Sequence, residues 1–310
     1  MSEIVKKIQE IRDQINRARK QSLLLRERNF WNQLCSSLDM VEDTDLAIDE
    51  YLNIEEENKL GMNYLLVFGI MQTLYVQQDA IINMAESIGV KIELDSKLKS
   101  IREIRNNSIG HPTKRGRKLQ SKYNYIVRAY LSHKNLSLMT VSPSEKDDTK
   151  FYHYNIVELI TLQYKSVNKI LGDFTKMLED EDKAHKDKFK EIKLADTFPG
   201  TINYHFQKLT ETSFGSNGKI LGKGNFEIIQ KSLEKFKEEL QRRDSLDAYS
   251  GINMTFEDLV YPMKKLEDYF NDNIEMNMEE IRIYKFFIKS KFDELIYMAK
   301  EIDEDYEGKV

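Results

Sequence analysis

The sequence has little of what punctuates or cross-links a protein chain. Its 310 residues include one cysteine, four prolines, thirteen glycines and one tryptophan. A single cysteine excludes an internal disulfide and a cysteine-rich zinc site. Cys35 lies in a helical apolar pattern, so we interpret it as a small buried hydrophobe rather than a nucleophile. The scarcity of glycine and proline lets most of the chain run as long helices.

Long apolar runs and an excess of positive charge are also lacking. The most apolar run, residues 64–71, is too short to span a bilayer, and the N-terminal residues have no signal-peptide core. We therefore expect a cytoplasmic protein that does not enter a membrane. The formal net charge is −5, so any nucleic-acid contact must come from a local basic patch. A content of 40% hydrophobic and 32% charged residues suits a folded, mainly α protein.

Apolar spacing predicts a helical bundle in the N-terminal half. The first helix would bury one face, made of Ile4, Ile8, Ile11 and Ile15. A second helical segment spans about residues 29–52 and could break at 41–45; its candidate core residues are Trp31, Leu34, Leu38 and Leu46. The strongest core helix, residues 62–88, ends at Gly89. Its polar residues predict contact either with a second chain or with buried partners: Gln72, Gln77, Gln78 and Asp79.

The pattern then changes to strands before it returns to helices. Apolar and polar residues alternate over 123–132, a turn fits at 133–135, and return strands fit at 136–142 and 150–154. We expect a small antiparallel β insertion, at about 121–154, between two helices. A long helical pattern resumes at Ile156.

A break at 197–201 suggests two domains. They are a helical domain with the β insertion, residues 1–195, and a second all-α domain of unknown role, residues 200–310. The charged stretch 179–193 before the break is either an exposed helix or a linker. In the second domain, Thr255 with an acidic residue three positions later resembles a helix N-cap.

Most chemical motifs fail the tests of spacing and context. The Gly- and Lys-rich stretch 213–224 lacks the Gly-Lys-Ser/Thr ending of a phosphate-binding loop, so we interpret it as a surface loop. The histidines are too scattered for metal ligation, and no Gly-x-Ser-x-Gly motif is present. We therefore expect no metal and no cofactor.

The segment Ile101–Pro112 concentrates the usable chemistry of the chain. It reads Ile-Arg-Glu-Ile-Arg-Asn-Asn-Ser-Ile-Gly-His-Pro, with Arg105 and His111 six residues apart. On an unbroken helix these side chains would point about 120° apart. Gly110 and Pro112 suggest that the helix stops first, which would let the guanidinium and the imidazole converge. A basic run suited to a phosphodiester follows directly: Lys114, Arg115, Arg117 and Lys118.

Spacing alone carries little weight, because Arg128 and His133 form a second pair of the same kind. That pair lies in the strand-like region, whereas Arg105 is followed by the amide pair Asn106–Asn107 at a helix end. A structural alternative is that Arg105 pairs with a carboxylate such as Glu103 and His111 caps a carbonyl group.

Arg105-Asn106, four further residues and then His111 resemble the signature of the HEPN superfamily, over roughly residues 1–180. The resemblance implies an antiparallel helical bundle and a metal-independent endoribonuclease, with two protomers bringing their motifs together in a homodimer. It implies that His111 acts as general base or acid at the ribose 2′-hydroxyl, that Arg105 holds the phosphate, and that Asn106 positions one of them. The products would be a 2′,3′-cyclic phosphate and a 5′-hydroxyl.

We accordingly expect a toxin or phage-defence effector that cuts cellular RNA, with tRNA among the candidate substrates. An antitoxin or regulatory protein would be a further partner. The alternative is a non-catalytic helical module that binds RNA, a nucleotide or a protein partner through the same basic groove. Residues 200–310 would sense a trigger or hold the nuclease inactive, or do neither.

Overall fold

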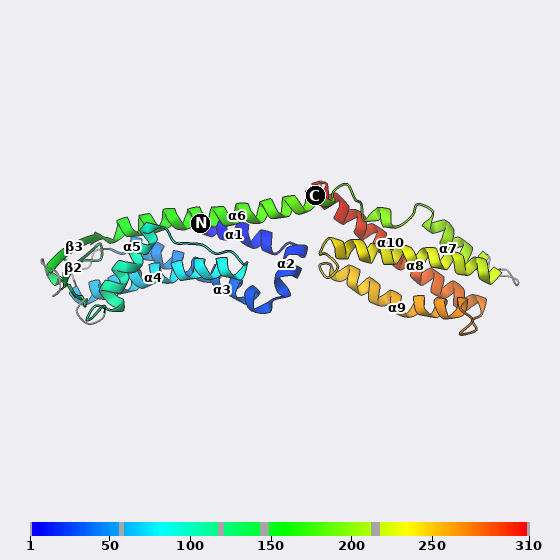
Figure 1. Ribbon diagram of the computed structural model, residues 1–310, viewed down its shortest axis with the longest axis horizontal. Coiled ribbons are helices and arrows are strands. Elements are labelled where there is room, and N and C mark those ends of the chain that lie inside the picture. Colours follow the sequence, from blue (N-terminus) through cyan, green and yellow to red (C-terminus); the bar gives the residue numbers. More distant parts are fainter. Residues whose placement is uncertain (1, 56–58, 117–120, 143–148, 212–217, 309–310) are drawn as a thin grey trace. The chain divides into compact units, whose positions relative to one another are not determined.

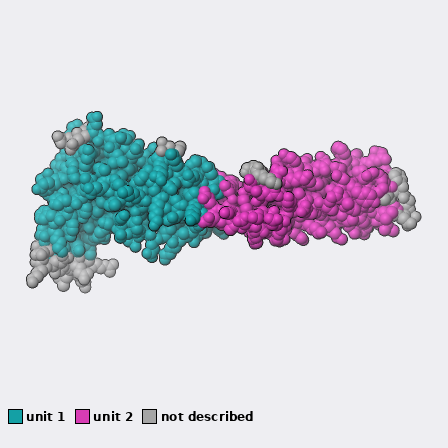
Figure 2. All heavy atoms as spheres, turned by 90° about the horizontal axis from the view of Figure 1, so that it is seen from above, with its two compact units in different colours: residues 1–15, 24–178 teal, residues 16–23, 179–310 magenta. Residues whose placement is uncertain are grey.

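The computed structural model describes residues 2–55, 59–116, 121–142, 149–211 and 218–308 (Figure 1). Within those residues it contains ten α-helices and one three-stranded antiparallel sheet, so the expected mainly α protein with a small β insertion is confirmed. The chain divides into two compact units, residues 1–15 with 24–178 and residues 16–23 with 179–310 (Figure 2). The units differ from the predicted domains in two ways: residues 16–23 belong to the second unit, and so do residues from 179 onward. Helix α6, Ile156–Phe189, covers most of the charged stretch 179–193 and passes from one unit into the other.

The first unit is a helical bundle with two buried apolar clusters. One joins α1, Glu3–Ile15, to α3, Arg28–Asn53, to α4, Leu60–Ser87, and to α6. The other lies beneath α5, Ser96–Arg105, and the sheet. The predicted face of α1 is confirmed, since each of its four isoleucines is at most 2% exposed. Gly89 follows α4 with φ 74°, as a helix-ending glycine does.

Two details of the helices differ from prediction. The α3 helix is continuous through residues 41–45, because Thr44 donates its hydroxyl to the carbonyl groups of Met40 and Val41 and stays within the helix. Leu46, predicted to be a core residue, is 66% exposed.

The polar residues of α4 find partners inside the first unit. Gln77 and Gln78 are fully buried and both bond Gln163 of α6, in each case at 2.8 Å. Gln163 also donates to the carbonyl group of Leu74 at 2.9 Å. The sequence left open whether these residues contact a second chain or buried partners. For Gln77 and Gln78, the structure shows buried partners.

By length and composition, α4 is also the one helix in the described part of the chain that could cross a membrane. Part of this helix packs into the two core clusters of the first unit, and 44% of its apolar window is buried.

The sheet lies at the end of the first unit where α6 begins (Figure 1). Strand β2, Asn135–Val141, pairs with β1, Tyr123–Ile126, and with β3, Thr149–Asn155. The strand predicted at 123–132 is shorter than expected, because residues Arg128–Tyr130 form a 3₁₀ turn. One sheet face packs into the core through Leu136 and Leu138.

The second unit is a bundle of α7, Ile202–Glu211, α8, Gly218–Arg242, α9, Ser250–Phe270, and α10, Met278–Tyr306. Its core is rich in phenylalanine and also encloses Arg243, which is 0% exposed and bonds Glu239 and the carbonyl group of Ile192.

Two predictions in the second unit are wrong. Thr255 is not an N-cap; it lies inside α9 and donates to the carbonyl group of Gly251. Residues 218–224, predicted as a surface loop, form the first turns of α8; residues 213–217 lie outside the described part. Gly222 lets α8 pack closely against Phe270, since a Cβ atom there would lie 2.7 Å from the ring.

Candidate functional site

Helix α5 carries the site and is anchored at its start by Asp95. The Asp95 carboxylate accepts the Leu98 backbone N–H at 2.9 Å and the Ser166 hydroxyl of α6 at 2.6 Å. Partial burial of the carboxylate opposes ionisation, but these hydrogen bonds outweigh it and lower the pKa of Asp95. The cap therefore fixes both the start of α5 and its position on α6.

The α-helix ends at Arg105 and widens into a π-helical turn, Asn106–Gly110. The His111 backbone N–H donates to the Asn106 carbonyl oxygen at 2.7 Å, and His111 itself leaves the helical conformation with φ −140°. The helical structure therefore ends before His111, as Gly110 and Pro112 predict. Single π-helical turns of this kind occur frequently at functional sites.

The Arg105 guanidinium is held by neutral groups. Its Nη2 and Nε donate to Oε1 of Gln72, at 2.7 and 3.1 Å, and its Nη1 donates to Oδ1 of Asn106 at 3.1 Å. The group lies 4.4 Å from the centroid of the Tyr75 ring. Within the described residues no carboxylate pairs with it, and Glu103 bonds Arg115 instead. The part of the structural alternative that pairs Arg105 with Glu103 is therefore wrong.

Gly110 brings the backbone next to this guanidinium. A Cβ atom at Gly110 would lie 2.7 Å from Nη1 of Arg105 and 3.2 Å from Oδ1 of Asn106, both closer than normal contact. The structure therefore brings together Arg105, Asn106 and the residue directly before His111. The His111 side chain is exposed, and no hydrogen bond or ion pair to it is found within the described part of the chain.

The basic run is only partly available to a ligand. Lys114 is exposed, whereas Arg115 makes a two-pronged ion pair with Glu103 and also donates to Oδ1 of Asn107 at 2.7 Å. Arg117 and Lys118 lie outside the described residues. Within the described part of the run, Lys114 is therefore the cation that a ligand could reach, in addition to the guanidinium of Arg105, which is paired with no described carboxylate.

The sequence analysis named Gln72 and Asp79 as contact residues without linking them to this site, and it missed Tyr75. Gln72, Tyr75 and Asp79 lie three and four positions apart on α4, so they share the face that meets α5. Arg102, one turn before Arg105, lies 4.0 Å from the Tyr75 ring centroid and pairs with Asp79 at 2.7 Å. The spacing of a glutamine, a tyrosine and an aspartate along one helix was the available signal.

The second Arg/His pair is not a site. His133 is 2% exposed, whereas Arg128 is exposed in the 3₁₀ turn. The two side chains therefore face different environments.

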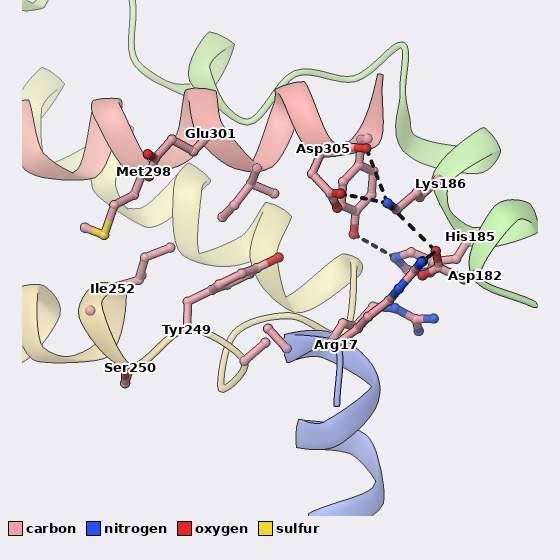
Figure 3. A pocket seen from close by; sticks show the side chains of 16 residues that line it. Arg17, Asp182, His185, Lys186, Tyr249, Ser250, Ile252, Met298, Glu301 and Asp305 are labelled. Atoms are coloured by element: carbon pink, nitrogen blue, oxygen red, sulfur yellow. Dashed lines mark hydrogen bonds and ion pairs between the residues drawn. The ribbon is translucent and has the colours of Figure 1, made fainter. Parts of the chain in front are cut away.

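A separate cavity of about 680 Å³ lies within the second unit (Figure 3). Lys186 pairs there with Asp305 at 2.8 Å and with Asp182 at 3.8 Å, and His185 is hydrogen-bonded to the Tyr306 hydroxyl at 2.9 Å. Burial, aided by the Arg19 charge, lowers the pKa of His185 to about 4, so the imidazole is neutral at pH 7. The cations lining this cavity are paired with carboxylates, which leaves Arg105 the stronger candidate for holding a phosphate.

No group of three or more histidine, cysteine, aspartate or glutamate side chains converges as a metal site within the described residues. Comparisons with protein-family models, with curated proteins and with solved structures found no match to the chain. Among the described residues, the structure thus shows a mainly helical protein in which Arg105, Asn106 and Gly110, the residue before His111, lie together at a helix end.

Proposed function

We propose that the protein is a metal-independent endoribonuclease whose site comprises Arg105, Asn106 and His111. The observation that carries the proposal is the guanidinium of Arg105, held against Tyr75 by two neutral amides and adjacent to the turn that presents His111. Because no carboxylate of the described residues neutralises Arg105, its charge is available to a phosphodiester.

The chemistry follows from these groups. His111 takes the proton of the ribose 2′-hydroxyl, as an imidazole does when it acts as a general base. The 2′-oxygen then bonds to phosphorus while the bond to the 5′-oxygen breaks, and that oxygen takes a proton from water or from a second imidazolium. Arg105 holds the negative charge that develops on the phosphate oxygens. The products are a 2′,3′-cyclic phosphate and a 5′-hydroxyl.

A homodimer would supply the second imidazole. Helix α4, whose Gln72 and Tyr75 contact Arg105, also exposes a row of large apolar side chains: Met62, Leu65 and Phe68. Leu65 is 68% exposed. Exposed apolar rows of this kind are typical of protein interfaces. We propose that two copies meet along this face of α4, so that the partner's His111 completes the site.

The biological setting is also a proposal: a cytoplasmic toxin or phage-defence effector, with tRNA among its substrates and an antitoxin or regulator as a partner. The second unit is the candidate for the regulatory role. Deletion of residues 200–310 that leaves activity and stability unchanged would remove that role.

The test is cleavage of total RNA and tRNA by the purified protein in EDTA. Arg105→Ala and His111→Ala should abolish the cyclic-phosphate ends, whereas Arg282→Ala and His205→Gln, in the second unit, should retain activity. Equal cleavage by wild type and by both site variants would falsify the proposal. Sequencing the cleaved ends identifies the substrate in the same experiment.

One observation favours a second candidate function, an RNA-binding module without catalysis. Within the described residues, no hydrogen bond orients the His111 imidazole. This candidate predicts salt-sensitive RNA binding that depends on Arg105, survives His111→Ala and yields no cyclic-phosphate product.

A further inference from the structure

The sheet of the first unit has an unusual outward face. The register places Tyr125 of β1, Met139 of β2 and Phe151 of β3 in one row across the sheet. Their neighbours along the strands point to the opposite face, where Ile126, Leu136 and Leu138 join the core. Tyr125 and Phe151 are 53% and 58% exposed, although the outward face of an antiparallel sheet is ordinarily polar. Two aromatic rings are therefore presented to solvent, about 10 Å apart by the spacing of strands.

A cavity of about 540 Å³ opens at one end of this face. Tyr130, which is 64% exposed, and His153 form an edge-to-face pair at its wall, and Nδ1 of His153 is hydrogen-bonded to the Ser137 hydroxyl at 2.8 Å. Asn135 and Glu158 also line it. An aromatic wall with amide, hydroxyl, imidazole and carboxylate groups matches the edge of a nucleobase, which has both donors and acceptors.

The charge of the sheet segment favours a polyanion over a protein partner. Described residues 121–142 and 149–155 contain four cationic residues and no aspartate or glutamate: Lys122, Arg128, Lys134 and Lys150. Arg128 and Lys134 are exposed beside Tyr130 in the connection from β1 to β2. The acidic residues of segment 143–148 lie outside the described part.

This face is joined directly to the candidate catalytic turn. The Asn124 backbone N–H donates to the Pro112 carbonyl oxygen at 2.8 Å, one residue after His111. Arg115 and Lys122 exchange two further backbone hydrogen bonds, at 2.8 and 2.7 Å. Strand β1, which carries Tyr125, is therefore fixed to the segment that carries His111.

We infer that the outward sheet face binds unpaired RNA, with one base stacked on Tyr125, one on Phe151 and a third in the cavity beside Tyr130. The inference rests on the proposed function for its substrate class and adds that single-stranded regions, not duplexes, are bound. Aromatic platforms favour single strands because a base inside a duplex has no free face. Arg128 and Lys134 hold the backbone through its phosphates.

The test measures binding rather than cleavage, so it does not depend on catalysis. Fluorescence anisotropy in EDTA would follow a labelled 12-nucleotide single strand and its duplex, both on the His111→Ala background. Tyr125→Ala and Phe151→Ala should each weaken single-strand binding at least fivefold, since stacking one base contributes about 1–3 kcal/mol. Tyr125→Phe and Phe151→Tyr keep the ring and should bind normally, as should Tyr204→Ala, which removes an exposed tyrosine from the second unit.

A second measurement covers the case in which an alanine variant fails to fold. Ultraviolet crosslinking of 4-thiouridine RNA to the otherwise unchanged His111→Ala protein should label the peptides that contain Tyr125, Tyr130 and Phe151. Labelling confined to other peptides, or equal affinity for single strand and duplex, would overturn the inference.

The two proposals can fail separately. Cleavage that persists unchanged in the Tyr125→Ala/Phe151→Ala double variant would contradict RNA binding by the outward sheet face but not the nuclease proposal. RNA binding that depends on Tyr125 and Phe151, in a wild-type protein that does not cleave RNA, would contradict the nuclease proposal but not RNA binding by the outward sheet face.

Discussion

Gln72 accepts two hydrogen bonds from Arg105, across the contact between α4 and α5, and adds no charge of its own. A glutamate at the same position would make equivalent contacts but neutralise the guanidinium. Under the proposed function, the choice between an amide and a carboxylate at residue 72 would set how much positive charge Arg105 offers to a phosphate.

Gln72→Glu should lower RNA cleavage while preserving the fold. We expect kcat/KM to fall about fivefold, since an exposed ion pair contributes up to about 1 kcal/mol and competes with the substrate. Gln72→Leu, which removes the hydrogen bonds without adding charge, is the matched control and should have the smaller effect. Steady-state cleavage of a labelled RNA provides the measurement, and wild-type activity in Gln72→Glu would contradict the role of Arg105.

Gly110→Ala should disturb the site more than the fold. The added Cβ would meet the Arg105 guanidinium at 2.7 Å, and the flexible end of that side chain can move away. We expect an activity loss of tenfold or more with a change in unfolding free energy below about 1 kcal/mol. Gly224→Ala is the control, because a Cβ there meets nothing within 4 Å; it should stabilise α8 by about 0.5–1 kcal/mol. Unchanged RNA cleavage by the Gly110→Ala variant would contradict the proposed role of the Arg105 guanidinium.

Asp95→Ala should destabilise the first unit by about 1 kcal/mol, the usual cost of a lost N-cap. Asp95→Asn should keep most of the cap, because an amide oxygen can accept from Leu98. The lowered pKa of Asp95 means that its stabilisation is present above the unfolded-state pKa and is lost as pH falls through the folded-state pKa. Urea unfolding from pH 6 to pH 3 should therefore converge for wild type and Asp95→Asn at the acidic end; parallel curves would contradict the assignment.

His185 should report on the cavity of the second unit. Its folded pKa of about 4 lies below the ordinary histidine value, so its contribution to stability is complete above about pH 6.5 and declines as pH falls toward 4. Proton NMR should show the His185 ring titrating near pH 4, and Tyr306→Phe, which removes its hydrogen-bond partner, should move that midpoint. A midpoint near 6.5 in the wild-type protein would mean that the ring is not buried as described.

Local pattern predicted the elements better than their partners. The isoleucine spacing of α1 and the alternation over the strands are properties of one segment, so they could be identified from sequence. The exposure of Leu46 and the position of Thr255 inside α9 depend on contacts with residues from elsewhere in the chain. Hydrophobic periodicity along one segment does not report those contacts.

In the candidate site, too, local features could be predicted from the sequence and contacts between distant residues could not. The Gly110–Pro112 helix end is local and was predictable, whereas the contacts of Arg105 with Gln72 and Tyr75 span about thirty residues and belong to the packing of α4 on α5. The pairing of Arg115 with Glu103 could not be predicted from the sequence either, because Glu103 was an equally suitable partner for Arg105. Arg105 and Arg115 carry the same charge, so the direction in which each side chain leaves the backbone decides which of them pairs with Glu103.

The amide cluster of Gln77, Gln78 and Gln163 has a consequence beyond the core that contains it. Helix α4 is apolar around much of its circumference, so burial alone would allow it to rotate about its axis or slide along α6. Amide hydrogen bonds are directional and costly to break when buried, so they select one rotation and one register. Gln72 and Tyr75 lie on the same rigid helix, within two turns of Gln77. We therefore expect the buried glutamines to influence the position in which Gln72 and Tyr75 hold the Arg105 guanidinium.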